Sequence, residues 1–522
     1  MIREISRRKC LRLWLCKPEY MERTKWENRF VLLRFRKKNY MMFLKDLKRF
    51  KMERLYDKLK AYSESDFYAF HMPGHKRNKT LLGIELPYDL DITEIDGFDD
   101  LHHADGILKE EQERAARVFG AEESHFLVNG STAGILSAVM GCTHRGDKIL
   151  VARHCHKSIY HAIYMNGLVP RYVYPEFDIS MHMNGEISKE DVAKALAAEP
   201  DIKAVVIVSP NYDGVVSDVK GIAEVAHSYR IPLIVDEAHG PHFGFHPAFP
   251  GRANDLGADV VINSLHKTLP SLTQTAILHI NGKLANRRRI KKYLDMLQSS
   301  SPSYIFMASL DACVDFVDGK CEEAFELYVE RLQKFREELK PLQHLQILRT
   351  EHYDISKVVI STANANITSP ELADRLRKEY HLEMEMTGGT YVLAMTTVAD
   401  TQEGLDRLKS ALLEIDDQLE AKTAVSGSIE ISGELPRLEQ YFTPQEAAER
   451  EEDGEAEEIP WKESEGHISL EYAYLYPPGS PVIVPGERIS REAVELLCYY
   501  ETQNLQIEGI QTEGKIKVWK HE

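Results

Sequence analysis

The stretch Val261-Ile-Asn-Ser-Leu-His-Lys267 is a short apolar run that ends in a serine, a histidine and a lysine. Upstream of it, Ile231-Pro-Leu-Ile-Val-Asp236 is a second apolar run, which ends in a carboxylate. Continuous apolar runs of this length are typical of strands that are buried on both faces, as in a parallel sheet. Because ligands bind at the carboxyl ends of such strands, the polar residues that follow the two runs are candidates for a site.

Similar apolar runs alternate with helical patterns from about residue 110 to residue 280. This alternation predicts an α/β fold with a mostly parallel, seven-stranded sheet that is covered by helices on both faces. The expected strands are 125–129, 148–152, 171–174, 203–209, 231–236, 259–264 and 275–280. The expected helices are 109–119, 132–141, 156–166, 189–198 and 219–229.

Lys267 and Asp236 form the pair that pyridoxal phosphate chemistry needs. The lysine binds the aldehyde of the cofactor covalently, and the aspartate keeps the ring nitrogen protonated, so that the ring can accept electrons. Burial of an ammonium is costly unless it is paired or neutralised, and the same burial lowers the pKa of the amine and makes it nucleophilic. For Lys267 considered alone, the alternative is an ordinary surface lysine. For Asp236 considered alone, the alternative is an aspartate that caps the following helix.

The run His125-Phe-Leu-Val-Asn-Gly130-Ser131-Thr132 indicates a strand, a tight turn and the start of a helix. Gly130 permits the turn, and the hydroxyls of Ser131 and Thr132 lie beside the first N–H groups of the helix, which favour a phosphate. An ordinary helix cap is the alternative. Ser264 and His266 are predicted to reach the same phosphate.

Three further residues are expected around the cofactor ring. Ala238 leaves room for a flat ring against the sheet. His239 is either a contact of the ring or an ordinary hydrogen-bonded histidine, and His156 could stack on the ring or simply cap a helix. His71 and His75 lack a cluster of other ligands at metal-binding spacing, so no metal site is expected.

The composition narrows the class of protein. The 522 residues are enough for two or three domains, and the net charge of −17 argues against a nucleic-acid or anionic-membrane partner. Seven scattered cysteines without a C-x-x-C pair indicate reduced thiols and a cytoplasmic protein. No apolar run reaches the roughly 18 residues that span a bilayer.

The charge is uneven along the chain. Residues 1–51 hold 17 Lys and Arg against 5 Asp and Glu, which indicates either a basic targeting arm or a start codon placed too far upstream. We expect this extension to be poorly ordered. The rest divides into an N-terminal segment (52–108), a cofactor-binding large domain (109–307), a small α+β domain (308–418), an acidic linker (419–465) and a C-terminal domain (466–522).

Taken together, the motifs resemble those of the bacterial ornithine/lysine/arginine decarboxylases in their short form, without a receiver-like N-terminal domain. The resemblance runs in order from about Met52 to the C-terminus, roughly nine-tenths of the chain. The motifs that carry it are His71-Met-Pro-Gly-His-Lys76, Asp91-Ile-Thr-Glu-Ile-Asp-Gly97, Asn129-Gly-Ser-Thr-Ala-Gly134, His156-Lys-Ser158, Asp236-Glu-Ala-His-Gly240, Ser264-Leu-His-Lys267, Ser301-Pro-Ser-Tyr304, Tyr476-Pro-Pro-Gly479 and Val484-Pro-Gly486.

This resemblance implies the aspartate-aminotransferase-like fold (fold type I) and pyridoxal phosphate as the cofactor. Lys267 would bind the cofactor, Asp236 would pair with its ring nitrogen, and His156 would stack on the ring. Ser131, Thr132, Ser264 and His266 would surround the phosphate. Because the family builds its sites between subunits, a homodimer or a larger homo-oligomer is implied, in which Ser301, Ser303 and Tyr304 would reach the cofactor of the neighbouring subunit.

The implied reaction is decarboxylation of arginine, lysine or ornithine to an amine of the polyamine pathway, and the sequence does not choose among the three. The acidic region 383–391 suits a cationic side chain, with Glu383, Glu385 and Glu471 as candidate contacts. An aminotransferase or a lyase of the same fold is one alternative, and a non-catalytic homologue that binds a partner is another. An aminotransferase commonly holds the α-carboxylate with an arginine of the small domain, whereas Arg375 and Arg377 here lie in a helix pattern.

Overall fold

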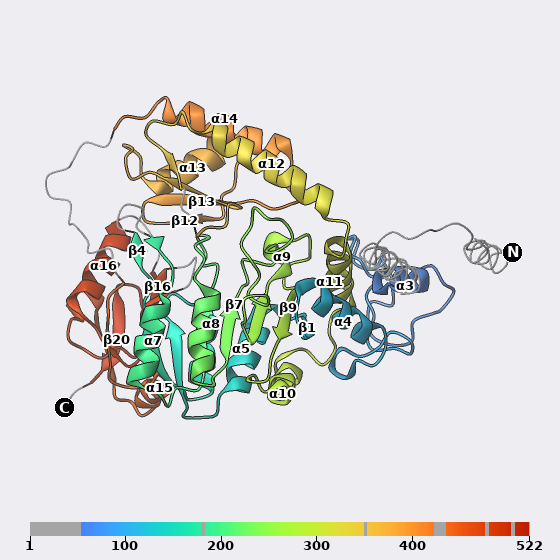
Figure 1. Cartoon of the computed structure of the whole chain (residues 1–522), viewed down its shortest axis with the longest axis horizontal. Helices are drawn as coiled ribbons and strands as arrows, with labels where there is room; N and C mark the ends of the chain where they lie inside the picture. Colours follow the sequence, from blue (N-terminus) through green and yellow to red (C-terminus); the bar gives the residue numbers. More distant parts are fainter. Residues whose placement is uncertain are drawn as a thin grey trace, which may run out of the picture. The chain divides into compact units, whose positions relative to one another are not determined.

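The computed structural model describes residues 54–178, 183–348, 352–421, 435–475, 480–502 and 507–520. The chain divides into Met1–Arg54 and Leu55–Glu522, and all elements below belong to the second unit (Figure 1). The basic extension 1–51 and the motif 476–479 therefore lie outside the described residues.

The largest sheet has seven strands in the order β1-β9-β8-β7-β6-β2-β3. The pairs β2–β3, β2–β6, β6–β7 and β7–β8 are parallel, and β9 is antiparallel to both of its neighbours. This arrangement confirms the predicted α/β fold with its mostly parallel sheet. The strands are β1 (Glu123–Leu127), β2 (Lys148–Ala152), β3 (Val169–Val173), β6 (Val205–Val208), β7 (Leu233–Asp236), β8 (Val260–Asn263) and β9 (Ala276–Ile280).

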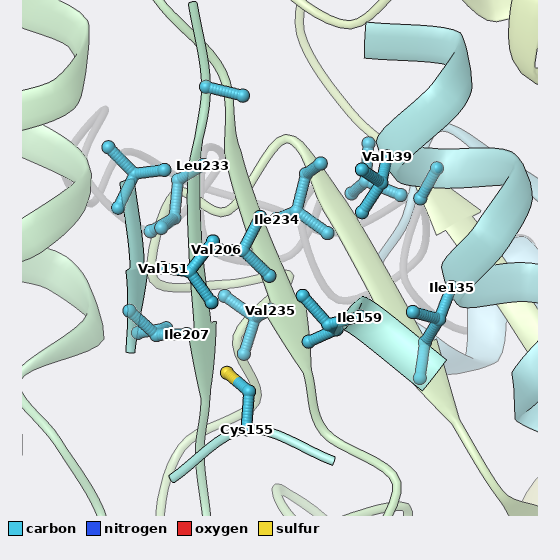
Figure 2. Packing of buried hydrophobic residues seen from close by; sticks show 14 of the residues in the cluster. Ile135, Val139, Val151, Cys155, Ile159, Val206, Ile207, Leu233, Ile234 and Val235 are labelled. Carbon is cyan, nitrogen blue, oxygen red and sulfur yellow. The ribbon is translucent and has the colours of Figure 1, made fainter. Parts of the chain in front are cut away.

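The centre of this sheet is buried because its strands are apolar at nearly every position. All residues of β6, β7 and β8 are buried. Figure 2 shows side chains of β6 and β7, such as Val206 and Ile234, in one cluster with Ile135, Val139 and Ile159 of the covering helices. This core fixes the carboxyl ends of β7 and β8, where the candidate site lies.

Helices cover the sheet, and α5 packs closely against α10. A Cβ atom at Gly141 of α5 would lie 2.8 Å from the Cα of Ile290, so this approach requires glycine. The helices of this part are α4 (Ile107–Phe119), α5 (Gly130–Cys142), α6 (Lys157–Met165), α7 (Lys189–Ala198), α8 (Val219–Ser228), α9 (Leu265–Thr268), α10 (Arg287–Leu297) and α11 (Tyr304–Val317). Shorter elements are α3 (Leu55–Ser63), η1 (Leu101–His103), β4 (Phe177–Asp178) and β5 (Met183–Asn184).

A second sheet has four antiparallel strands in the order β10-β11-β13-β12. Its helix α13 begins with a capping box between Thr368 and Glu371, which explains why the chain turns into a helix there. The elements are α12 (Glu322–Glu338), β10 (Gln346–Ile347), β11 (Lys357–Ser361), α13 (Ser369–Tyr380), β12 (Met386–Thr387), β13 (Tyr391–Met395) and α14 (Gln402–Asp416).

The C-terminal region corrects one prediction. The acidic segment 419–465 is not a linker over its second half, because Ala456–Pro460 (β15) pairs with Lys515–Trp519 (β20). The glutamates of β15 lie at exposed positions, so the sequence there resembles an acidic linker and lacks the apolar pattern of a strand. Residues 422–434 are outside the described residues. The other elements are β14 (Glu439–Gln440), α15 (Pro444–Glu452), η2 (Trp461–Glu463), β16 (Ala473–Leu475), β17 (Pro481–Ile483), β18 (Glu487–Arg488), α16 (Arg491–Thr502) and β19 (Ile507–Glu508).

Candidate active site

Asp236 and Lys267 lie at the same edge of the large sheet. Asp236 is the last residue of β7, and Lys267 is in the short helix α9, which directly follows β8. The two strands are parallel neighbours, with Asp236 opposite Ile262. Asp236 is buried, and its Oδ1 accepts a hydrogen bond of 3.1 Å from the N–H of Ala238. The sheet register therefore brings together the two residues that the sequence analysis paired.

The charges of these two residues act on each other. Burial raises the pKa of Asp236 above its ordinary value, and the Lys267 ammonium opposes this rise. Burial lowers the pKa of Lys267, while Asp236 and then Glu385 act in the opposite direction. A second cation beside Asp236 would also favour its ionised form. Lys267 is thus held closer to the neutral, nucleophilic state than an exposed lysine.

The start of α5 offers a place for an anion at the same edge. Gly130 has a φ of +72°, which favours glycine, and the space where a Cβ would lie is open. The hydroxyls of Ser131 and Ser264 are hydrogen-bonded to each other and so join this helix start to the turn before α9. Thr132 follows as an exposed residue. A pair of hydroxyls at a helix N-terminus is a setting that suits a phosphate group.

Two histidines flank this edge. His266 donates from Nδ1 to the carbonyl oxygen of Thr275 at 2.9 Å, which leaves Nε2 for a ligand. His156 is the N-cap of α6, and its Nδ1 accepts from the N–H of Ser158 at 3.2 Å. Burial, and then the charge of Lys267, lower the pKa of His156 to about 4. Its ring is therefore neutral near pH 7, and a neutral ring can stack on a flat ligand.

His239 contacts two lysines, one of which the sequence analysis missed. Its Nε2 lies 2.9 Å from Nζ of Lys267, and its Nδ1 lies 3.1 Å from Nζ of Lys357. Lys357 is fully buried and comes from β11 of the four-stranded sheet. The ring of Tyr212, which was also missed, lies 4.6 Å from that of His239. The structure thus shows His239 hydrogen-bonded between two lysines, and its contact with the cofactor ring stays a prediction.

The three glutamates proposed for the substrate have different surroundings. Glu385 accepts a hydrogen bond from the hydroxyl of Tyr212, so it lies beside the lysine–histidine cluster. Glu383 is exposed. The prediction does not hold for Glu471, because this buried carboxylate accepts from the N–H groups of Gln511 at 3.2 Å and Lys517 at 2.9 Å. Glu471 instead stabilises the C-terminal region.

Tyr304, for which a contact with a neighbouring subunit is predicted, has its side chain inside its own chain. This side chain is completely buried within its own chain, and its hydroxyl donates to the carbonyl oxygen of Asp99. The hydroxyl of Ser303 accepts from the N–H of Phe306 at 3.4 Å and caps α11. Ser301 is exposed, so for this residue the contact stays a prediction.

The described residues also bear on metal binding and on membrane insertion. Among these residues, no group of three or more His, Cys, Asp and Glu side chains is arranged to hold a metal ion. Within the same ranges, no helix has both the length and the apolar character needed to cross a bilayer.

Comparisons with known proteins agree with the motifs. The family described as "Orn/Lys/Arg decarboxylase, major domain" matches residues 53–371, and the C-terminal domain of the same family matches residues 433–514. An arginine decarboxylase of Bacillus subtilis (strain 168) is 33% identical over 471 residues, which is 87% of this chain and 95% of that protein. A constitutive lysine decarboxylase of Escherichia coli (strain K12) is 23% identical, over 84% of this chain and 76% of that protein.

Solved structures show the same fold. The E. coli constitutive lysine decarboxylase superposes with a TM-score of 0.77 at 20% identity, covering 96% of this chain and 86% of that one. The Francisella novicida lysine decarboxylase gives 0.76 at 20% identity, covering 92% and 84%. The fold and the site residues thus define a fold type I enzyme. The chain belongs to the Orn/Lys/Arg decarboxylase family, and it is a decarboxylase that acts on a basic amino acid.

Proposed function

We propose that this protein uses pyridoxal 5'-phosphate to remove the α-carboxyl group of arginine, with lysine and ornithine as the other candidate substrates. The observation that carries the proposal is the placement of Lys267 and Asp236 at neighbouring strand ends, beside the start of α5. Arginine comes first because four relatives that are 32–33% identical are named arginine decarboxylases, whereas three that are named lysine decarboxylases are 23–25% identical.

The residues present fit the cofactor by their chemistry. Gly130, Ser131, Thr132, Ser264 and His266 would hold the phosphate, because they combine helix N–H groups, hydroxyls and a ring nitrogen. Lys267 would bind the aldehyde, and Asp236 would hold the proton of the ring nitrogen. The neutral ring of His156 would cover one face of the cofactor, and Ala238 would leave space on the other.

When bound, pyridoxal phosphate supplies a cationic ring that accepts the electrons left by the departing CO2. Asp236 keeps that ring protonated, because its carboxylate favours a positive charge beside it. Lys267 would hold the aldehyde of the cofactor when no substrate is bound. His239 lies against Nζ of Lys267, where it can orient this amine and move a proton to or from it.

The side chain of the substrate would be bound by acidic residues. Glu385 is the leading candidate, because it lies beside the cluster and its field acts on both Lys267 and Lys357. Both glutamates are exposed, and we assign Glu383 a weaker, longer-range contribution because it is the charge of Glu385 that acts on the two lysines. A carboxylate suits a guanidinium or an ammonium, and a charge-assisted hydrogen bond of this kind contributes about 1.5–3 kcal/mol.

A direct product assay tests this function. The full-length chain is incubated with pyridoxal phosphate and with arginine, lysine or ornithine in turn, and agmatine, cadaverine, putrescine and CO2 are measured. Release of agmatine with equimolar CO2 is expected. Formation of a keto acid in place of an amine would contradict the proposed decarboxylation. Cadaverine or putrescine as the sole amine would show that lysine or ornithine, and not arginine, is the substrate. Glu385→Gln should raise KM for arginine more than it lowers kcat, and Glu383→Gln is the matched control.

We also propose that the enzyme is a homodimer or a larger homo-oligomer. A segment before α4 exposes an unusual run of large apolar side chains, including Phe67 at 68%, Phe70 at 88% and Leu81 at 73%. Soluble monomers rarely expose contiguous apolar patches, so we assign this surface to a second copy of the chain. Light scattering should give at least twice the mass of one chain, and Phe70→Ser with Leu81→Ser should reduce it. A wild-type monomer would contradict this proposal.

The cysteines of the chain bear on its cellular compartment. The cysteines in the described residues are unpaired, namely Cys142, Cys155, Cys313, Cys321 and Cys498. Unpaired thiols favour a reducing compartment, so we propose the cytoplasm. Agmatine, cadaverine and putrescine are small cationic amines, and we propose that the product serves polyamine synthesis.

A further inference from the structure

His239 connects two amines through its two ring nitrogens. Lys267 Nζ lies 2.9 Å from Nε2, and Lys357 Nζ lies 3.1 Å from Nδ1. Lys267 belongs to α9 beside the large sheet, whereas Lys357 begins β11 of the four-stranded sheet. The cluster therefore joins the proposed cofactor lysine to a second lysine from another part of the fold.

The polarity of hydrogen bonds limits the charge that this cluster can carry. A neutral imidazole has one N–H donor and one accepting nitrogen, and an ammonium can only donate. The lysine that faces the accepting nitrogen of His239 can be an ammonium, but the lysine that faces its N–H must be a neutral amine. The ring itself stays neutral, because burial and both lysines lower the pKa of His239 well below its ordinary value. The two lysines therefore share one proton.

The surroundings of Lys357 make its amine easier to deprotonate than that of an exposed lysine. Its side chain is fully buried, and its stem packs on Gly214, where a Cβ would lie 2.7 Å from Cγ of Lys357. Burial lowers the pKa of Lys357 to about 8, although Asp354, Glu385 and Asp213 favour the ammonium. Asp236 and Glu385 act on Lys267, and the charge of Lys267 itself opposes the ammonium of Lys357. Lys267 also acts on two nearby histidines, His156 and His266.

We propose that Lys357 is a positioning residue that takes up the proton that Lys267 must release, with His239 between them. The Lys267 ammonium gives a proton to Nε2 of His239, and Nδ1–H of His239 gives its own proton to the neutral amine of Lys357. Lys267 ends as a neutral amine with a free electron pair, Lys357 ends as an ammonium, and His239 ends as the other neutral tautomer. No net charge enters or leaves the buried cluster, so the exchange avoids isolating a charge.

This inference rests on the proposed role of Lys267 as the lysine that binds the cofactor. The test uses the full-length chain freed of cofactor and mixed with pyridoxal phosphate over a series of pH values. The measured quantity is the rate at which visible absorbance appears on covalent attachment, which reports the neutral fraction of Lys267. Because the two amines are coupled, the wild-type rate should rise in two steps with pH.

Lys357→Met removes the second base, so Lys267 must lose its proton to solvent. The rate should then rise in one step at higher pH. At neutral pH it should be at least about tenfold below wild type, and at alkaline pH it should equal wild type. The exposed Lys334→Met in α12 is the matched control and should follow wild type. His239→Leu should produce the same shift as Lys357→Met, and the double variant should add nothing further.

Several outcomes would overturn the role of Lys357. These are an equal loss of rate at every pH, an unchanged midpoint, or additive effects of Lys357→Met and His239→Leu. If Lys357→Met does not fold, the wild-type profile decides, since a single step contradicts two coupled amines. Absence of visible absorbance in the wild type would instead contradict the proposed function itself.

Discussion

At the scale of single residues, Glu237 next to Asp236 makes stability depend on pH. Burial raises its pKa to about 8, against hydrogen bonds from the side chain of Asn263 at 3.0 Å and the N–H of Ala253 at 2.8 Å. The folded state therefore holds a proton that the unfolded chain releases above its ordinary pKa of 4.5. This contribution to stability is fully present below that value and is lost as the pH rises through about 8.

Glu237→Gln should remove this dependence. The melting temperature of the wild type should fall as the pH rises from 4.5 to about 8, whereas that of the variant should change less. Above about pH 8 the variant should be more stable than the wild type by about 1–3 kcal/mol. Glu224→Gln, at an exposed position of α8, is the control and should behave as wild type. The idea fails if the wild type and Glu237→Gln have parallel pH profiles in thermal melts.

The sequence predicts site residues well where a motif is local. Asp236 ends one apolar strand, and Ser264 and Lys267 follow the next, so their positions at one sheet edge follow from the pattern. Lys357 was missed because it precedes Val-Val-Ile like any surface lysine before a strand, and only the tertiary fold brings it to His239. The role of Glu471 was missed because its partners are backbone N–H groups on another strand.

At the scale of elements, the start of α5 should bind the phosphate. Gly130→Ala puts a side chain at a φ of +72°, which costs roughly 1–2 kcal/mol. Gly454→Ala is a matched control, since Gly454 has a φ of +79° and equally open space. Both variants should lose similar stability in urea unfolding. Only Gly130→Ala should weaken pyridoxal phosphate binding in titrations, and equal affinities would remove the helix start from the site.

The strand predictions are confirmed where a continuous apolar run in the sequence corresponds to a buried strand. Strand β2 was predicted with its observed bounds, and the other six strands of the large sheet overlap their predicted ranges. The segment 456–460 was missed because its exposed edge strand carries glutamates, so it lacks an apolar signal. The burial of Tyr304 could not be predicted, because its contact with Asp99 depends on a segment about two hundred residues away.

At the scale of the whole molecule, one buried ion pair attaches the C-terminal region to the large sheet. Arg153, just after β2, donates from Nη1 and Nη2 to the Glu487 carboxylate at 2.9 and 2.8 Å. Both side chains are almost completely buried (1% and 0% exposed), so removing one charge leaves the other without a partner. Both regions belong to the same compact unit of the chain, Leu55–Glu522.

Glu487→Gln should therefore destabilise the protein by about 3–5 kcal/mol in urea unfolding. The control is Glu495→Gln, which breaks the exposed pair with Arg491 and should cost no more than about 0.5 kcal/mol. A similarly small effect of both substitutions would show that the buried pair does not hold the C-terminal region in place.

The most direct test of the account is the covalent position of the cofactor. The full-length chain is loaded with pyridoxal phosphate, reduced with borohydride and digested, and the modified lysine is located by mass spectrometry. We predict that the label lies on Lys267 and that Lys267→Ala abolishes both the label and amine formation. A label on another lysine, or none on a chain that still releases CO2 from arginine, would contradict the central claim.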